Sequence, residues 1–209
     1  MEFEQLHEER NTGANSMSPY VFDRLDEIES ANAGPGDLSV EAGELMEEFA
    51  KGADELALLI ERYGGSSTPP IAQSLSFVLA KSAKQPTPAM AGLVLAFLSR
   101  FRCKGQAEAV MNTLTAVQHF LHYCPIEGSG QPGYRSLFAF VKDCLEYDGR
   151  HCIIIKGHAL AVLSIAHSRG IVENIFDSHE IAALRDRMHR LRMSEGEELR
   201  EELSALEDL

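Results

Sequence analysis

The chain has 209 residues, of which 44% are hydrophobic and 24% charged, and its formal net charge is −13. This composition is ordinary for a soluble globular protein, and no apolar run approaches the roughly 20 residues that a membrane-spanning helix needs. The acidic N-terminus lacks the apolar core of a signal peptide, and the four cysteines have no paired spacing, so we expect a cytoplasmic protein with reduced thiols and no membrane contact.

Charge is distributed unevenly along the chain. Residues 1–63 carry a net charge of −12, residues 64–170 carry +5, residues 171–193 are neutral and residues 194–209 carry −6. One interpretation is that an acidic surface keeps the protein soluble. The alternative is that the acidic ends attract a basic protein, or that the basic middle attracts an acidic partner.

Helical periodicity and helix-start signals divide the chain into one helix after another. Residues 1–17 are polar and lack periodicity, which predicts a mobile acidic tail, and residues 18–209 form one α-helical domain. The expected helices cover 18–32, 39–63, 69–84, 88–102, 105–123, 134–147, 151–169, 178–191 and 194–206, with a short turn or half-helix at 171–176. Ser-Pro at 18–19 and Thr-Pro at 68–69 and 87–88 are typical of a cap followed by proline in the first turn. Ser194 and Glu197 have the spacing of a capping box.

Apolar residues recur at a spacing of 44 residues, from Phe49 to Leu93 to Leu137. Each marks the first helix of a candidate pair, and the pairs cover 39–84, 88–123 and 134–169, followed by C-terminal helices at 178–208. A period of about 40–47 residues made of two helices is typical of HEAT and armadillo repeats. Over residues 39–169 the chain therefore resembles the HEAT-like αα-hairpin solenoids, and the fold class that we expect is all-α. The alternative is an irregular helical bundle in which the spacing is a coincidence.

Repeat stacks of this kind present an extended surface for binding, so the resemblance implies a non-enzymatic protein-binding module. A small acidic chain without a catalytic motif also suits a stoichiometric inhibitor, such as the immunity protein of a bacterial toxin, because an acidic inhibitor is steered toward a basic target. The candidate partner-binding residues are Glu41, Glu44, Glu48, Glu197, Glu198 and Glu201.

A second hypothesis is nucleic-acid binding through the basic middle of the chain. The candidate basic patch comprises Lys81, Lys84, Arg100, Arg102 and Lys104. Cations at helix ends can contact phosphates, although they also suit a helix C-terminus in solvent. The acidic ends argue against this hypothesis.

A third hypothesis is a metal site. His119 and His122 lie one turn apart on an expected helix, and Cys124 follows at its end. Zinc sites normally show tighter pairings, so no metal or other cofactor is favoured. A homodimer through the amphipathic segment 178–206 is a further alternative, and the chain is expected not to be an enzyme.

Overall fold

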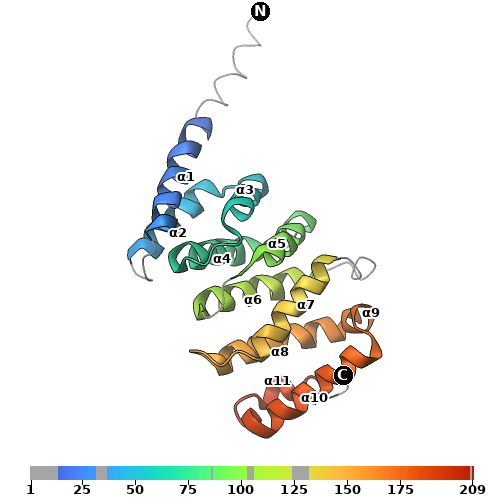
Figure 1. Cartoon of the computed structure of the whole chain (residues 1–209). Coiled ribbons are helices and arrows are strands. Elements are labelled where there is room, and N and C mark those ends of the chain that lie inside the picture. The colour runs from blue at the N-terminus through green and yellow to red at the C-terminus, as the bar shows by residue number, and fades with distance from the viewer. Residues whose placement is uncertain (1–13, 32–36, 86, 103–105, 124–131, 208) are drawn as a thin grey trace, which may run out of the picture.

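The computed structural model describes residues 14–31, 37–85, 87–102, 106–123, 132–207 and 209 (Figure 1). This part of the chain contains eleven helices and no strand, so the all-α prediction is confirmed. No helix in it has the length and apolarity to cross a membrane. The helices are α1 (Ala14–Ser30), α2 (Asp37–Phe49), α3 (Ala53–Tyr63), α4 (Pro69–Ala83), α5 (Pro88–Arg100), α6 (Ala107–Leu121), α7 (Pro132–Leu145), α8 (Cys152–Ser168), α9 (Ile171–Ile175), α10 (Ser178–Glu195) and α11 (Arg200–Ser204).

The helices stack in two layers that follow the chain from one end of the molecule to the other (Figure 1). In one layer α2, α4, α6 and α8 pack side by side, and α11 packs on α8. In the other layer α3 packs on α5 and α5 packs on α7. Each helix of the second layer also contacts the helix that follows it in the chain. The chain therefore forms a stack of helix pairs.

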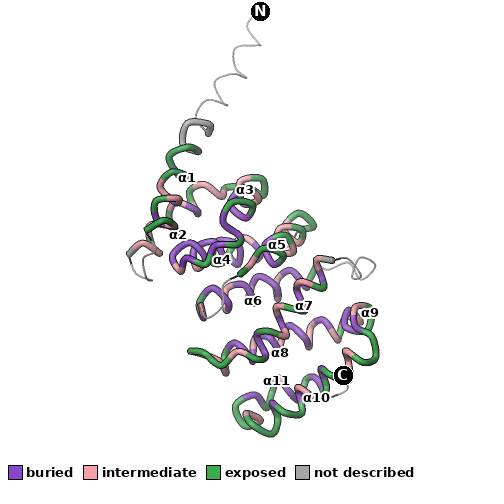
Figure 2. Tube along the Cα trace, viewed as in Figure 1, coloured by how far each residue is buried: buried purple, intermediate pink, exposed green. Residues whose placement is uncertain are grey.

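The core lies between the two layers and extends along the whole stack (Figure 2). Leu75, Leu114 and Ala159 each have 0% of their surface exposed, and they come from α4, α6 and α8. Hydrogen bonds between side chains link the same layer: Gln73 of α4 accepts from Ser39 over 3.3 Å and donates to Glu108 over 3.0 Å. Each helix thus buries its apolar stripe against the next pair.

The prediction of one helix at 39–63 is wrong. This segment forms two helices, and they lie in different layers. α2 ends at Phe49, and α3 begins at Ala53 after Gly52, whose backbone is extended at φ −146° and ψ −178°. A single helix of 25 residues would be about 37 Å long at 1.5 Å per residue, and the following helix, α4, has only 15 residues. The break lets both segments bury their apolar faces.

This break also changes the repeat. Phe49 lies in α2, whereas Leu93 and Leu137 lie in α5 and α7 of the other layer, so the three residues are not equivalent. α5 and α7 do begin 44 residues apart, at 88 and 132. By contrast, α4 and α6 begin at 69 and 107 and end at 83 and 121, which is 38 residues apart. The helices of the two layers thus follow one another at unequal intervals, and the likeness to HEAT repeats stays a prediction.

Two helix starts also differ from the expected ones. α1 begins at Ala14, so residues 14–17 belong to a helix and Pro19 lies inside it. At the other end Ser194 lies within α10, where its hydroxyl donates to the carbonyl of Arg190. The capping box is instead at the start of α10, where Asp177 accepts from the amide of Glu180 and the Glu180 side chain accepts from the amide of Asp177. The helix that was expected to end at residue 191 therefore continues to Glu195.

A cleft between α5 and α7 as the candidate binding site

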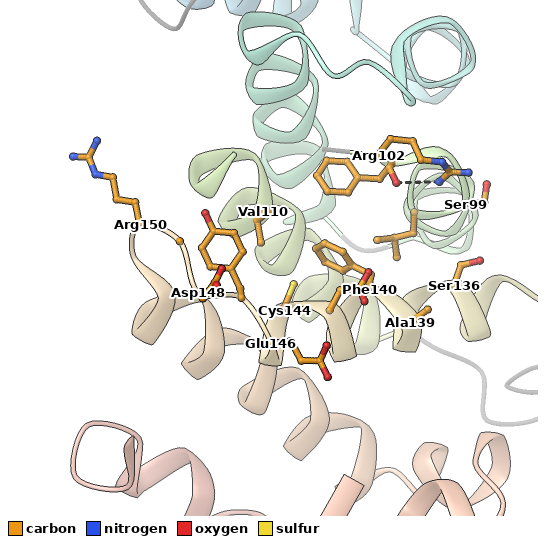
Figure 3. A pocket seen from close by; sticks show the side chains of 15 residues that line it. Ser99, Arg102, Val110, Ser136, Ala139, Phe140, Cys144, Glu146, Asp148 and Arg150 are labelled. Carbon is orange, nitrogen blue, oxygen red and sulfur yellow. Dashed lines mark hydrogen bonds between the residues drawn. The ribbon is translucent and has the colours of Figure 1, made fainter. Parts of the chain in front are cut away.

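A cleft of about 740 Å³ lies where the end of α5 meets α7, bordered by the start of α6 and by the turn after α7 (Figure 3). Its floor is apolar and its rim is polar. The floor is formed by Leu98, Phe101, Val110, Phe140 and Cys144. The rim includes Ser99, Arg102, Ser136, Asp143, Glu146, Tyr147, Asp148 and Arg150. This volume lies within the range of about 300–1,000 Å³ that is usual for ligand pockets.

Phe101 forms the α5 side of the cleft floor, and its position follows from the way α5 ends. α5 ends at Arg100, and the backbone of Phe101 leaves the helical region at φ −58° and ψ 124°. The ring of Phe101 then packs 5.1 Å from the ring of Phe97 and 5.5 Å, edge to face, from the ring of Phe140 in α7. Because these aromatic rings are half-buried or buried, they form a firm apolar floor.

The other side of the cleft follows one face of α7. Ser136, Phe140, Asp143 and Tyr147 recur every three or four residues, which places them on one side of a helix and of the turn that continues it. At 1.5 Å per residue the eleven steps from 136 to 147 span about 16 Å. The cleft is therefore elongated, with the serines 99 and 136 at one end and Asp148 at the other (Figure 3).

The charged groups on the rim differ in whether another group of the protein pairs with them. Glu146 forms an ion pair with Arg187 of α10. Among the residues that the structure describes, no ion pair is formed by Asp143 or Asp148. Arg102 donates to the carbonyl of Phe101 over 3.0 Å, and Arg150 extends away from the other lining side chains (Figure 3).

Two groups in the cleft keep their protons at neutral pH. Burial, together with the nearby charge of Asp143, raises the pKa of the Cys144 thiol to about 12. Burial, followed by the charge of Asp148, raises the pKa of Tyr147. Cys144 thus acts as a small apolar side chain rather than a nucleophile, because the thiolate is the reactive form. Tyr147 offers a neutral hydroxyl at the acidic end of the cleft.

The acidic residues predicted to bind a partner lie at opposite ends of the stack. Glu41, Glu44 and Glu48 are on α2, whereas the residues 197, 198 and 201 lie near α11, beyond α4, α6 and α8. Arg24 binds Glu41 through hydrogen bonds of 2.6 and 3.0 Å, which lower the pKa of that carboxyl. The two groups therefore form separate surfaces.

The predicted basic patch is also divided. Lys81, in the last turn of α4, forms an ion pair of 2.6 Å with Glu47, and Lys84 follows it. Arg100 donates to the carbonyl of Glu61 in the last turn of α3 and lies beside Gly64, in the turn that leads to α4. These cations thus lie at opposite ends of α4, Arg102 lines the cleft, and Lys104 lies outside the described residues.

The proposed metal ligands are only partly described. His119 and His122 lie at the end of α6, and Cys124 lies outside the described residues. Burial, followed by the charges of His122 and Lys84, lowers the pKa of His119. In the part of the chain that the structure describes, no group of three His, Cys, Asp or Glu residues could hold a metal ion.

The C-terminal segment predicted to form a dimer uses its apolar face within the chain. Leu184, Met188, Leu191, Leu199 and Leu203 are buried. A Cβ atom added to Gly157 of α8 would lie 3.7 Å from Leu199, which shows how closely this segment packs on α8.

The cleft itself was not predicted from the sequence. One signal in the sequence could have indicated the cleft. The apolar stripe of α7 comprises Leu137, Phe138, Val141, Cys144 and Leu145, and Phe140 is a large aromatic residue outside that stripe. Such a residue must either be exposed or cover a neighbouring element. Its neighbour, Phe101, is 39 residues earlier, and that pairing needs the structure.

No known protein family, curated protein or solved structure matches this chain.

Proposed function

We propose that this chain is a non-enzymatic protein-binding module, and that the cleft between α5 and α7 takes an amphipathic segment of a partner protein. The observation that carries this proposal is the combination of an apolar aromatic floor with a polar rim along about 16 Å of α7. A helix of about three turns has the same length, and helices often bind such grooves by their apolar face.

The aromatic floor supplies most of the expected affinity. Phe101 and Phe140 are half-buried in the free protein, and a partner side chain on them would remove their remaining surface from water. Aromatic residues near the centre of an interface contribute a large share of binding energy. The rim then sets orientation through charge and hydrogen bonds.

A stoichiometric inhibitor, such as an immunity protein that neutralises a basic toxin, is one form of this function. The net charge of −13 would steer a basic partner toward the chain and would make the association rate depend on salt.

Nucleic-acid binding is supported less well. Ordinary phosphate binding needs several cations on one surface, and Lys81 and Arg100 lie at opposite ends of α4. A metal-dependent role has no three-ligand group among the described residues to support it.

The test is to block the cleft without touching the core. Ala139 is exposed on the cleft rim, so Ala139→Trp should fill the cleft, whereas Ala96→Trp adds the same side chain to an exposed position of α5 outside the cleft. Partners captured from the source cells are identified by mass spectrometry and purified, and their affinity is measured by calorimetry.

We expect one protein that binds in a 1:1 ratio, that loses at least tenfold in affinity with Ala139→Trp and that is unaffected by Ala96→Trp. A purified partner that binds both variants equally would contradict the proposal. A nucleic acid lost at about 500 mM salt would favour the basic residues instead.

A further inference from the structure

We infer that the segment bound in the cleft is basic, and that it presents a Lys or Arg side chain to Asp143 and Asp148 beside the apolar side chain that covers Phe140. This inference rests on the proposed function and specifies the chemistry of the partner.

The two carboxylates both lie on the rim of the cleft. Asp143 lies three residues after Phe140, which is less than one helical turn, and both side chains line the cleft. Asp148 follows in the turn beyond α7, at the opposite end of the cleft from Ser99 and Ser136 (Figure 3). A side chain that covers Phe140 therefore has both acids on the same side of it.

The described part of the chain leaves these two acids without an ion pair. Asp143 and Asp148 are both exposed, and neither forms an ion pair within it. Glu146, which lies between them in the sequence, is already paired with Arg187. Two acids of three thus remain available to a cation from outside.

The surroundings add negative potential at this end. α7 ends at Leu145, so its C-terminal carbonyl groups, which carry the negative end of the helix dipole, lie beside the acids. Glu108 of α6 is close enough to Tyr147 to contribute to its raised pKa, which places a further carboxylate near the same end.

Two of the nearby cations, Lys142 and Arg187, are held by other carboxylates. Arg102 donates to the carbonyl of Phe101 on the α5 side of the cleft. Arg150 is also on the rim, and its side chain extends away from the other lining side chains (Figure 3). Lys142 lies 4.7 Å from the ring of Phe176 and 3.9 Å from Glu180. Arg187 and Arg190 border Asp143 from a smaller hollow of about 360 Å³, on the side of α10, and Arg187 is held by Glu146.

The expected occupant follows from this arrangement. An apolar side chain fills the floor between Phe101 and Phe140, and a cation three or four residues along the same helical face reaches Asp143 or Asp148. Acidic side chains at that position would be repelled. The preference is moderate because the acids are exposed and an exposed ion pair contributes little.

Three probes of matched shape test the charge preference: 4-phenylbutylammonium, 4-phenylbutan-1-ol and 4-phenylbutanoate. Each is titrated into the full-length ¹⁵N-labelled protein, and the dissociation constant is taken from amide shifts of the cleft residues. We expect the ammonium to bind about threefold more tightly than the alcohol, the carboxylate to bind most weakly, and the difference to shrink at about 500 mM salt.

Variants of the two acids test whether they cause the charge preference. Asp143→Asn with Asp148→Asn should bring the ammonium to the affinity of the alcohol, whereas Asp23→Asn removes an exposed acid of α1 and should change nothing. The inference is overturned if the three probes bind equally, if the preference survives the double variant, or if no probe shifts the cleft residues. If the three probes bind equally and Ala139→Trp abolishes their binding, the cleft is still a binding site, but it has no charge preference. The capture experiment tests the proposed function separately.

Discussion

The hydroxyl of Tyr63 in α3 donates a hydrogen bond of 2.7 Å to the carboxylate of Asp26 in α1. Arg62 forms an ion pair with the same carboxylate, and its guanidinium lies 5.0 Å from the ring of Phe22. Apart from these contacts to α3, α1 packs mainly on α2 and α4. The contacts of Asp26 therefore add a separate attachment of the first helix to the stack.

This attachment predicts a stability that depends on pH at both extremes. The hydrogen bond from Arg62 lowers the pKa of Asp26, so the stabilisation that Asp26 gives is present above its unfolded pKa near 3.8 and is lost as the pH falls through the lower folded value. Burial, followed by the bond to Asp26, raises the pKa of Tyr63 above 10.0, so its contribution is lost as the pH rises above that unfolded value.

Urea unfolding followed by circular dichroism at several pH values measures the effect. Tyr63→Phe should flatten the alkaline loss of stability, and Asp26→Asn should flatten the acidic one. Asp23→Asn, at an exposed site three residues before Asp26, is the matched control. Equal pH profiles for the wild type and Tyr63→Phe would mean that the hydroxyl does not hold α1.

A buried ion pair joins the C-terminal helices to the stack. Lys156 of α8 lies 2.6 Å from Glu195 of α10, and the two side chains are only 10% and 22% exposed. Glu195→Ala would leave a buried ammonium without its partner, which should reduce the free energy of unfolding by about 3 kcal/mol. The double variant Lys156→Met with Glu195→Leu should recover most of that loss, since an apolar pair of similar volume often replaces a buried ion pair at little cost.

The urea midpoints of the wild type, Lys156→Met, Glu195→Leu and the double variant measure the coupling between the two residues. If Glu195→Ala alone changes the midpoint no more than a surface substitution such as Glu198→Ala, the pair does not hold α10 in place.

The same pair marks the limit of prediction from the sequence. The pattern of residues 151–169 correctly predicted a buried helix, and the Thr-Pro signal correctly predicted the start of α5, where Thr87 accepts from the amide of Met90. Both signals are local. The partner of Lys156 is 39 residues away, as is the partner of Phe101 in the cleft, and no local pattern specifies either one.

The error at residues 39–63 has the same origin. Apolar residues keep helical spacing across Ala50, Lys51 and Gly52, so periodicity alone predicts one helix. The chain breaks there because two short helices can be covered by the two layers, and that is a property of the packing. Gly52 was the only local sign of a helix break, because glycine destabilises the interior of a helix.

The layer formed by α2, α4, α6 and α8 should be sensitive to cavities. Leu114 has 0% of its surface exposed between α4 and α8, so Leu114→Ala should destabilise the fold by about 2–5 kcal/mol through lost contacts and a residual cavity. Leu58 is 49% exposed on α3, and Leu58→Ala should cost less than about 0.5 kcal/mol.

Thermal unfolding by calorimetry compares the two variants with the wild type. A small shift for Leu114→Ala would indicate that α6 is not central to the core. A large shift for Leu58→Ala would indicate that its exposed side chain is covered in solution.

Thiol chemistry gives a direct test of the cleft floor. The pKa of Cys144 is about 12, so at pH 8 only about one thiol in 10⁴ is ionised, whereas an ordinary cysteine with a pKa near 8.5 is about one quarter ionised. Cys152 is half-buried at the start of α8. Two single-cysteine proteins isolate these thiols: each replaces the other three cysteines, among the positions 103, 124, 144 and 152, by serine.

Reaction with iodoacetamide at pH 8, followed by mass spectrometry, should be at least a hundredfold slower at Cys144 than at Cys152 in the native protein, because both burial and protonation protect Cys144. In 6 M guanidinium chloride the two rates should converge. If Cys144 reacts as fast as Cys152 under native conditions, then the floor of the cleft is open to water and the rings of Phe101 and Phe140 do not shield the thiol.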